Sequence, residues 1–218
     1  GMPTPKDSVH SFSDPELGQY AFVFPLGRDR FRCYLGYHQA EGRTPPSGPA
    51  GVERFIASSI ASGAPAAWFA HAAPVGPLAS FRCADNWVEH PFMACLALIG
   101  DAAATSDPSF GCGLSLALRD ARVLADFLSS TDDWAAAGHA YAAEHDRYFG
   151  AIHTQIDLMT RLLYEPGPAA ARRRQTAFAR LALQPGLRPD LAGLGPEWPA
   201  GPDPAAALFG TPGAVVPA

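Results

Sequence analysis

Seven consecutive apolar residues, 93–99, end at Gly100. Short apolar runs bounded by a turn residue are typical of a strand that is buried on both faces. A loop of mostly small residues follows, and apolar side chains then recur at helical spacing after Gly113. These side chains are Leu114, Leu118, Ala121, Ala125 and Leu128. The pattern predicts a buried strand, a small-residue loop and an amphipathic helix that begins at glycine.

Before this stretch the pattern predicts strands and one short helix. Residues 20–26 and 30–37 are rich in aromatic and apolar side chains, and residues 27–29 between them are Gly-Arg-Asp, which together predict an antiparallel hairpin. Apolar spacing predicts a helix over residues 52–61. Residues 78–82 predict a further strand that leads toward the central one.

Three other segments are predicted to have no regular structure. The first 17 residues are mostly polar and contain three prolines, residues 41–51 are rich in glycine and proline, and so is the tail from Gln184 onward. Proline cannot donate to a strand ladder, and glycine lowers the stability of helices and strands. We therefore expect an irregular entry, a loop and a tail that follows the surface.

The C-terminal part predicts long helices. An apolar stripe with three- and four-residue steps runs through residues 134–163, with Gly138 and Gly150 as weak points in that helix. Residues 169–183 predict a final helix. The stripe consists of Trp134, Ala137, Tyr141, His145, Tyr148, Ile152, Ile156, Met159 and Leu163. We interpret His145, which lies on the stripe, as a core histidine.

These elements predict the α+β fold class. Residues 1–92 form an antiparallel or mixed sheet region, and residues 93–218 contain the buried strand, the glycine-led helix and the long C-terminal helices. With 48% hydrophobic residues, the 218-residue chain can bury a core. Its net charge of −5 excludes a strongly basic surface for nucleic acid or anionic membrane. No apolar segment reaches the roughly 20 residues that span a bilayer, so we expect a cytoplasmic protein.

The cysteines and histidines do not form a metal-binding pattern. No Cys-x-x-Cys pair occurs, and we expect reduced structural thiols at Cys33, Cys83, Cys95 and Cys112. A helix N-terminus could lower the pKa of Cys112, although an unreactive thiol is the simpler interpretation. His139 and His153 lie off the register of His145, so no metal set is expected.

The loop between strand and helix carries the candidate chemistry. Gly111 and Gly113 let backbone approach a ligand, and the helix start offers unpaired N–H groups. A dinucleotide-binding loop needs a third glycine where Leu116 stands, and its first glycine directly follows the strand. The pattern is therefore not a Rossmann phosphate loop.

The whole string of loop residues is more informative than its glycines. It consists of Gly100-Asp101-Ala102-Ala103, Asp107-Pro108, Gly111, Gly113-Leu114 and Asp120-Ala121. It resembles the second flavin-binding motif of the class A flavoprotein monooxygenases, the p-hydroxybenzoate-hydroxylase-like aromatic hydroxylases. Ala104, Cys112 and Ser115 stand where that family has His, Gln and Asn.

The resemblance implies an FAD site. Asp101, after Gly100, would accept a hydrogen bond from the ribityl chain, and Pro108 would border the flavin ring. Backbone from Gly111 through Cys112 and Gly113 to Leu114 would face the pyrimidine edge of the ring, and Ser115 would offer a hydroxyl there. The family uses NAD(P)H and O2 to hydroxylate an aromatic or polycyclic substrate. Its antiparallel sheet covers the flavin, which makes Phe22, Phe24, Cys33 and Leu35 candidates for the covering face, with ordinary core packing as the simpler interpretation of each.

The N-terminal Gly-x-Gly-x-x-Gly unit of that family does not occur in this sequence. The chain therefore resembles the C-terminal half of such a monooxygenase. We expect such a half to be inactive or poor in FAD by itself, because it supplies only part of the cofactor contacts. Unpaired edges of the central strand predict self-association or association with a missing N-terminal half. Sedimentation velocity tests self-association, and a monomer at all concentrations would contradict it.

Two other functions compete with this one. Gly113-Leu114-Ser115-Leu116-Ala117 approximates the nucleophile elbow of a serine hydrolase, with Ser115 as nucleophile. That serine must lie on a strained turn directly between strand and helix, which makes the hydrolase the weaker alternative. The third possibility is a non-enzymatic remnant or assembly module, in which Asp101 caps a turn and the glycines permit close helix packing.

Overall fold

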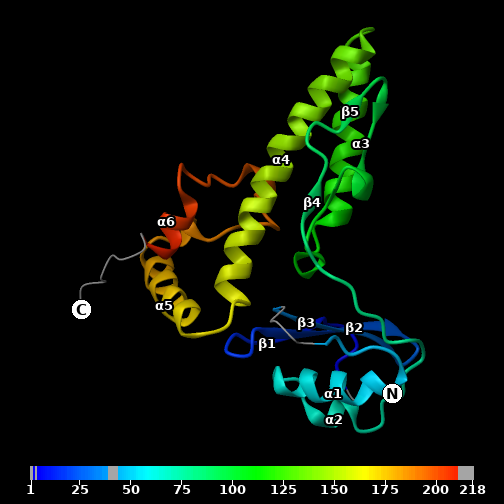
Figure 1. The fold of residues 1–218 in the computed structure, drawn as a ribbon, viewed down its shortest axis with the longest axis vertical. Helices are drawn as coiled ribbons and strands as arrows, with labels where there is room; N and C mark the ends of the chain where they lie inside the picture. The colour runs from blue at the N-terminus through cyan, green and yellow to red at the C-terminus, as the bar shows by residue number, and fades with distance from the viewer. Residues whose placement is uncertain (1, 3, 39–43, 211–218) are drawn as a thin grey trace. The chain divides into compact units, whose positions relative to one another are not determined.

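The computed structural model describes residue 2, residues 4–38 and residues 44–210. These residues form helices and small antiparallel sheets, which confirms the predicted α+β class (Figure 1). They belong to two compact units, Gly1–Phe81 with Thr160–Ala179 and Arg82–Met159 with Arg180–Ala218. None of the helices described is both long enough and apolar enough to cross a membrane.

A three-stranded antiparallel sheet organises the first unit. It contains β1 His10–Asp14, β2 Gln19–Gly27 and β3 Arg30–Tyr37, in the order β1-β2-β3. The predicted hairpin is β2 and β3, closed by Arg28 and Asp29, which both have positive φ as tight two-residue hairpin turns require. The prediction that residues 1–17 are irregular was wrong for β1. This mostly polar strand forms because β2 offers it an unpaired edge.

Two helices cover one face of this sheet. They are α1 Val52–Ala61, as predicted, and the short α2 Ala66–Phe69 (Figure 1). Their contact surface is the apolar cluster of Met2, Val23, Ala64 and Phe69, with Phe12, Phe31, Ile56, Ile60 and Trp68 at its margin. The predicted strand over residues 78–82 was wrong, because this segment has no regular structure. Part of the predicted loop 41–51 lies outside the described residues.

The residues predicted to share one sheet face lie on two. Cys33 is paired with Val23, whereas Phe22 is paired with Tyr34, the neighbouring residue of β3. Since paired side chains point the same way and neighbours point to opposite faces, Phe22 and Phe24 are opposite Cys33 and Leu35. The aromatic face is continuous, with ring centroids 5.8 Å apart between Phe22 and Phe24.

Two antiparallel helices form the centre of the second unit. They are α3 Gly113–Ser130 and α4 Trp134–Leu163, which lie side by side in Figure 1. Both helices were predicted, and most of the α4 stripe is buried, although Trp134 is 69% exposed. The shared core contains Cys112, Leu116, Val123, Tyr141, Tyr148, Phe149, Ile152 and Ile156.

Helix α3 buries a different face from the predicted one. Leu114 and Leu118 are 75% and 64% exposed, whereas Leu116, Asp120 and Val123 are buried. Both faces of α3 are partly apolar, so hydrophobic spacing alone could not decide between them. The choice follows from α4, which packs against the face that carries Asp120.

The predicted buried strand over residues 93–99 was wrong. The segment folds back on itself as a tiny hairpin, β5 Phe92–Met93 paired with β6 Leu96–Ala97. Its two-residue turn has φ values of 49° and 66° at Ala94 and Cys95, a conformation that non-glycine residues rarely adopt. The turn leaves Met93 77% and Leu96 63% exposed.

The C-terminal part is more ordered than predicted. Helix α5 Pro168–Leu183 is the predicted final helix, but the tail contains a further helix, α6 Pro204–Phe209. In α6 Leu208 is fully buried. The buried Gln155 side chain of α4 also fixes the tail, donating to the Gly195 carbonyl at 2.6 Å. Buried apolar and hydrogen-bonding residues thus order the described part of a tail whose composition predicted an irregular path. Residues 211–218 of that tail lie outside the described residues.

Candidate functional site

The Gly100–Asp101 turn is held against helix α3. Gly100 has a φ of 58° and begins the 3-10 turn Gly100–Ala102. Its N–H donates to Asp120 Oδ2 at 2.7 Å, and the Asp120 side chain is 2% exposed. A Cβ on Gly100 would lie 3.4 Å from that of Ala117. The turn therefore needs glycine for its backbone angles and Asp120 for its position.

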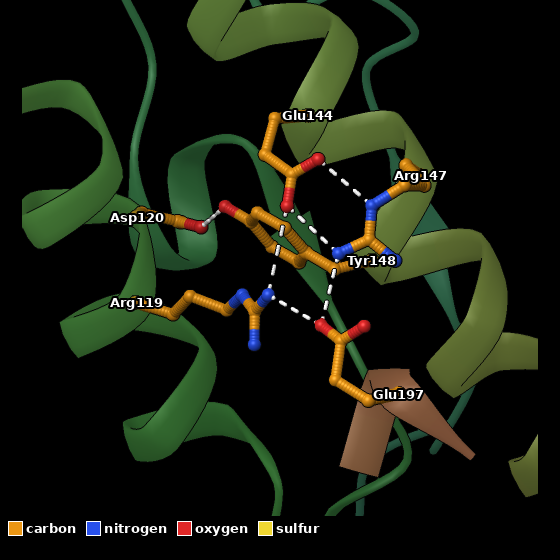
Figure 2. A network of polar contacts seen from close by, with 6 residues as sticks. All are labelled: Arg119, Asp120, Glu144, Arg147, Tyr148 and Glu197. Carbon is orange, nitrogen blue, oxygen red and sulfur yellow. Dashed lines mark hydrogen bonds and ion pairs between the residues drawn. The ribbon is translucent and has the colours of Figure 1, made fainter. Parts of the chain in front are cut away.

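Asp120 is also the acceptor of the Tyr148 hydroxyl, which lies on α4 (Figure 2). Burial, together with the bond to Asp120, raises the pKa of Tyr148 far above its ordinary value, so the phenol remains a donor. One buried carboxylate thus joins the turn, α3 and α4. Asp120 belongs to the sequence motif, but the motif predicts no role for it.

Besides Asp120, four charged side chains lie around Tyr148 (Figure 2). The Arg119 guanidinium lies 4.9 Å from the centroid of the Tyr148 ring. It also binds Glu197 at 2.8 Å, and Arg147 binds both Glu144 and Glu197. Hydrogen bonds from Arg147 hold the pKa of the Glu144 carboxyl below its usual value, with Arg119 as a further cause. This network fixes the tail turn Gly195–Glu197 to α3 and α4.

The loop between the turn and α3 has its own internal supports. Asp107 accepts hydrogen bonds from Ser109 and precedes the 3-10 turn Pro108–Phe110. Gly111 then has a φ of 70°, in the left-handed region that favours glycine. Cβ atoms added at Gly111 or Gly113 would have no neighbour within 4 Å. These two glycines therefore do not serve close packing, and they leave the backbone open to approach.

The start of α3 is an exposed group of backbone donors. The first helical bond runs from the Leu116 N–H to the Cys112 carbonyl at 3.0 Å, so the N–H groups before it have no partner within the helix. No side chain caps this end. Leu114 and Ser115 are exposed beside it. Backbone donors and the positive end of the helix dipole can hold an electronegative ligand edge.

Cys112 lies at the N-cap of α3 but is buried, and its thiol contacts the Phe110 carbonyl at 3.7 Å. Burial raises the pKa of this thiol, and the nearby Asp85 carboxylate raises it further. The possibility of a lowered pKa was therefore wrong, because desolvation and a negative neighbour oppose the helix dipole.

We expect Ellman's reagent to modify Cys112 at least tenfold more slowly than the exposed Cys95, because only the thiolate reacts and Cys112 is shielded. Two variants, one that retains only Cys112 and one that retains only Cys95, allow the two modification rates to be measured separately. Equal rates in the folded protein would contradict this prediction, and equal rates in urea serve as the control.

A second group of polar residues, which the sequence did not predict, adjoins the loop. Strand β4 Asn86–Trp87 pairs with β7 Ala104–Thr105, which brings Asp85 next to the loop. Asp85 accepts the Asp107 N–H at 2.7 Å and binds His153 of α4 at 2.6 Å. Because Asp85, Asp107 and His153 are far apart in sequence, no local pattern predicts that they are in contact. In the described part of the chain, no cluster of three potential metal ligands occurs.

Most predicted site residues therefore lie along one continuous loop. Gly100 and Asp101 lie in the turn against α3, Pro108 and Gly111 lie in the loop that follows, and Gly113 and Leu114 begin the helix. Asp101 is exposed, whereas Cys112 faces the core. The loop thus combines an exposed carboxylate at Asp101 with open glycine backbone at Gly111 and Gly113. Comparison with models of known protein families and with curated proteins finds no match.

Proposed function

We propose that this chain contributes one edge of the FAD site in an FAD-dependent monooxygenase that hydroxylates aromatic or polycyclic compounds. The observation that carries the proposal is the open backbone at Gly111 and Gly113, which lies before an uncapped helix start. Glycines that served helix packing would have close neighbours, and these have none. The exposed Asp101 carboxylate, on the turn that Asp120 fixes to α3, adds the acceptor that the resemblance implies.

Each group has a separate task in this proposal. The Asp101 carboxylate would accept hydrogen bonds from the ribityl hydroxyls, and Pro108 would border the ring. Backbone donors from Gly111 to Leu114 would hold the pyrimidine edge, with the Ser115 hydroxyl nearby. FAD itself would supply electron transfer from NAD(P)H and activation of O2. Asp120 and Tyr148 would position the turn without touching the cofactor.

Titration with FAD, followed by flavin fluorescence, tests the proposal. We expect weak but saturable binding by the chain at high FAD concentration, because the chain supplies only part of the cofactor contacts. Binding by Asp101→Ala should be at least tenfold weaker still, since a hydrogen bond that involves a charged group contributes about 1.5–3 kcal/mol. Asp126→Ala, which removes another exposed carboxylate, on helix α3, is the control. Absence of saturable binding by the folded chain, or equal affinity in Asp101→Ala, would reject the proposed site.

The non-enzymatic module remains the second candidate, favoured by Ala104, Cys112 and Ser115 at positions where the resembled family has other residues. An FAD-loaded chain that consumes NAD(P)H would favour the enzyme over the module. The hydrolase has less support, because Ser115 lies inside α3 and is not among the residues with positive φ. A nucleophile elbow requires a strained turn directly after a strand.

A further inference from the structure

Two histidines from distant parts of the sequence meet at the surface of the second unit. His90 lies just before β5, and His139 lies in α4, 49 residues further along the chain. Nε2 of His90 is 2.7 Å from Nδ1 of His139, with ring centroids 5.0 Å apart. The two nitrogens are closer than stacked ring faces can be, so the rings meet through their edges. One of these nitrogens donates its proton, and the other offers a lone pair.

The backbone of both histidines is fixed. The His90 N–H donates to the two carboxylate oxygens of Asp146 on α4, at 3.2 and 3.0 Å. Pro91, the next residue, is fully buried. His139 is held by helix α4, and the Phe92 ring meets its imidazole edge to face, with centroids 5.0 Å apart. Two imidazoles on anchored backbone form a preorganised pair of ligands.

The spacing of the two nitrogens suits one metal ion. Both histidines are exposed, so an ion can reach them from solvent. Metal–nitrogen bonds of about 2.0–2.1 Å place two nitrogens about 2.9 Å apart at right angles and about 3.4 Å apart in a tetrahedron. The observed 2.7 Å is closer to the right-angle value. Cu(II) and Ni(II) prefer such tetragonal geometry, whereas Zn(II) prefers the tetrahedron.

We propose that His90 and His139 together bind one Cu(II) ion, and Ni(II) or Zn(II) more weakly. Affinity for nitrogen ligands rises from Ni(II) to Cu(II) and falls again at Zn(II). Among the described residues no third histidine, cysteine or carboxylate completes a cluster with this pair, so water fills the remaining positions. The donating imidazole passes its proton to its outer nitrogen through solvent. Both rings then bind the ion as neutral ligands, and no net proton is released.

The bound ion would join the segment before β5 to helix α4 at a second point, beside the bond from His90 to Asp146. Because both ligands come from folded segments, the ion binds the folded chain and should raise its melting temperature. The inference does not rest on the proposed flavin site, whose residues run from Gly100 to Ser115. The two sites can therefore be tested separately.

Isothermal titration calorimetry of tag-free protein with Cu(II) chloride, in glycine buffer as a weak competing chelator, tests the proposal. We expect one saturable equivalent of Cu(II), with weaker binding of Ni(II) and Zn(II). His90→Gln and His139→Gln should each bind Cu(II) at least about tenfold more weakly, because the second imidazole no longer binds within the same molecule. Electron paramagnetic resonance of the Cu(II) complex should show coupling to two imidazole nitrogens in the unmodified protein.

The remaining variants make the test specific. The double variant His90→Gln/His139→Gln should lose little more affinity than either single variant, because each single change already breaks the chelate. His71→Gln, at an exposed histidine of the other unit, is the matched control and should bind Cu(II) as the unmodified protein does. Circular dichroism checks that each variant folds, and either single variant alone is enough to decide the result.

Several weak equivalents of Cu(II), or an affinity that both single variants retain, would overturn the proposal and indicate adventitious surface binding only. An equal loss in His71→Gln would do the same. Tighter binding of Zn(II) than of Cu(II) would overturn the tetragonal assignment. Intact Cu(II) binding without FAD binding would reject the proposed flavin site alone, and intact FAD binding without the Cu(II) equivalent would reject the histidine site alone.

Discussion

Replacing Asp120 with alanine is expected to lower the free energy of unfolding by about 3 kcal/mol. The change leaves the Gly100 N–H and the Tyr148 hydroxyl without their acceptor, in a site where Asp120 is 2% exposed. Each unsatisfied buried donor costs about 1–3 kcal/mol. Urea denaturation measures the loss. Because the Gly100–Asp101 turn also loses its anchor, the proposed site should bind FAD more weakly in this variant.

Two further variants show how much of the loss is due to the Asp120 carboxylate itself. Asp126→Ala, on the exposed side of the same helix, should change the free energy of unfolding by less than about 0.5 kcal/mol. Tyr148→Phe removes only one of the two bonds and should cost about half as much as Asp120→Ala. If Asp120→Ala were no more destabilising than Asp126→Ala, Asp120 would not join the turn to the two helices.

The elements that the sequence predicted correctly are those whose pattern is local. The β2–β3 hairpin has alternating side chains and a two-residue turn, and α4 follows its apolar stripe for thirty residues. In both cases the side chains that decide the structure lie within one segment. Capping is local as well, since Asp133 accepts the Ala136 N–H at 3.0 Å at the start of α4.

The apolar run 93–99 shows why burial could not be predicted in the same way. An apolar run becomes a strand buried on both faces only where other strands flank it. In the described structure its only strand pairing is within its own hairpin, β5 with β6. Helix α3 is a similar case, because two of its faces are partly apolar and the packing of α4 determines which of them is buried.

The same distinction, between local patterns and contacts among distant residues, applies to the candidate site. Gly100, Asp101 and the glycines of the loop are close in sequence, so their motif could be read directly. The partners that hold them are distant: Tyr148 is 28 residues from Asp120, and His153 is 68 residues from Asp85. No periodicity connects such residues. His153 was correctly placed off the core stripe, but its pairing depends on how β4 meets α4.

The two glycines inside α4 are expected to respond to alanine with opposite signs. At Gly150 a Cβ would meet nothing within 4 Å, so Gly150→Ala should stabilise the protein by about 0.5–1 kcal/mol through helix propensity. At Gly138 a Cβ would lie 2.2 Å from the Phe92 ring. Overpacking of this kind costs about 1–3 kcal/mol, which exceeds the gain in propensity.

Urea denaturation of both variants measures the difference, with the same helix and the same substitution as internal control. Gly138→Ala should be the less stable by about 2 kcal/mol. Adding Phe92→Ala to Gly138→Ala should recover part of the loss, because the ring that the new Cβ meets is then absent. Equal effects at the two positions would mean that Phe92 does not pack on α4. The β5–β6 hairpin that carries Phe92 would then be free of that helix, and the path from β5 to the Gly100 turn would lose this support.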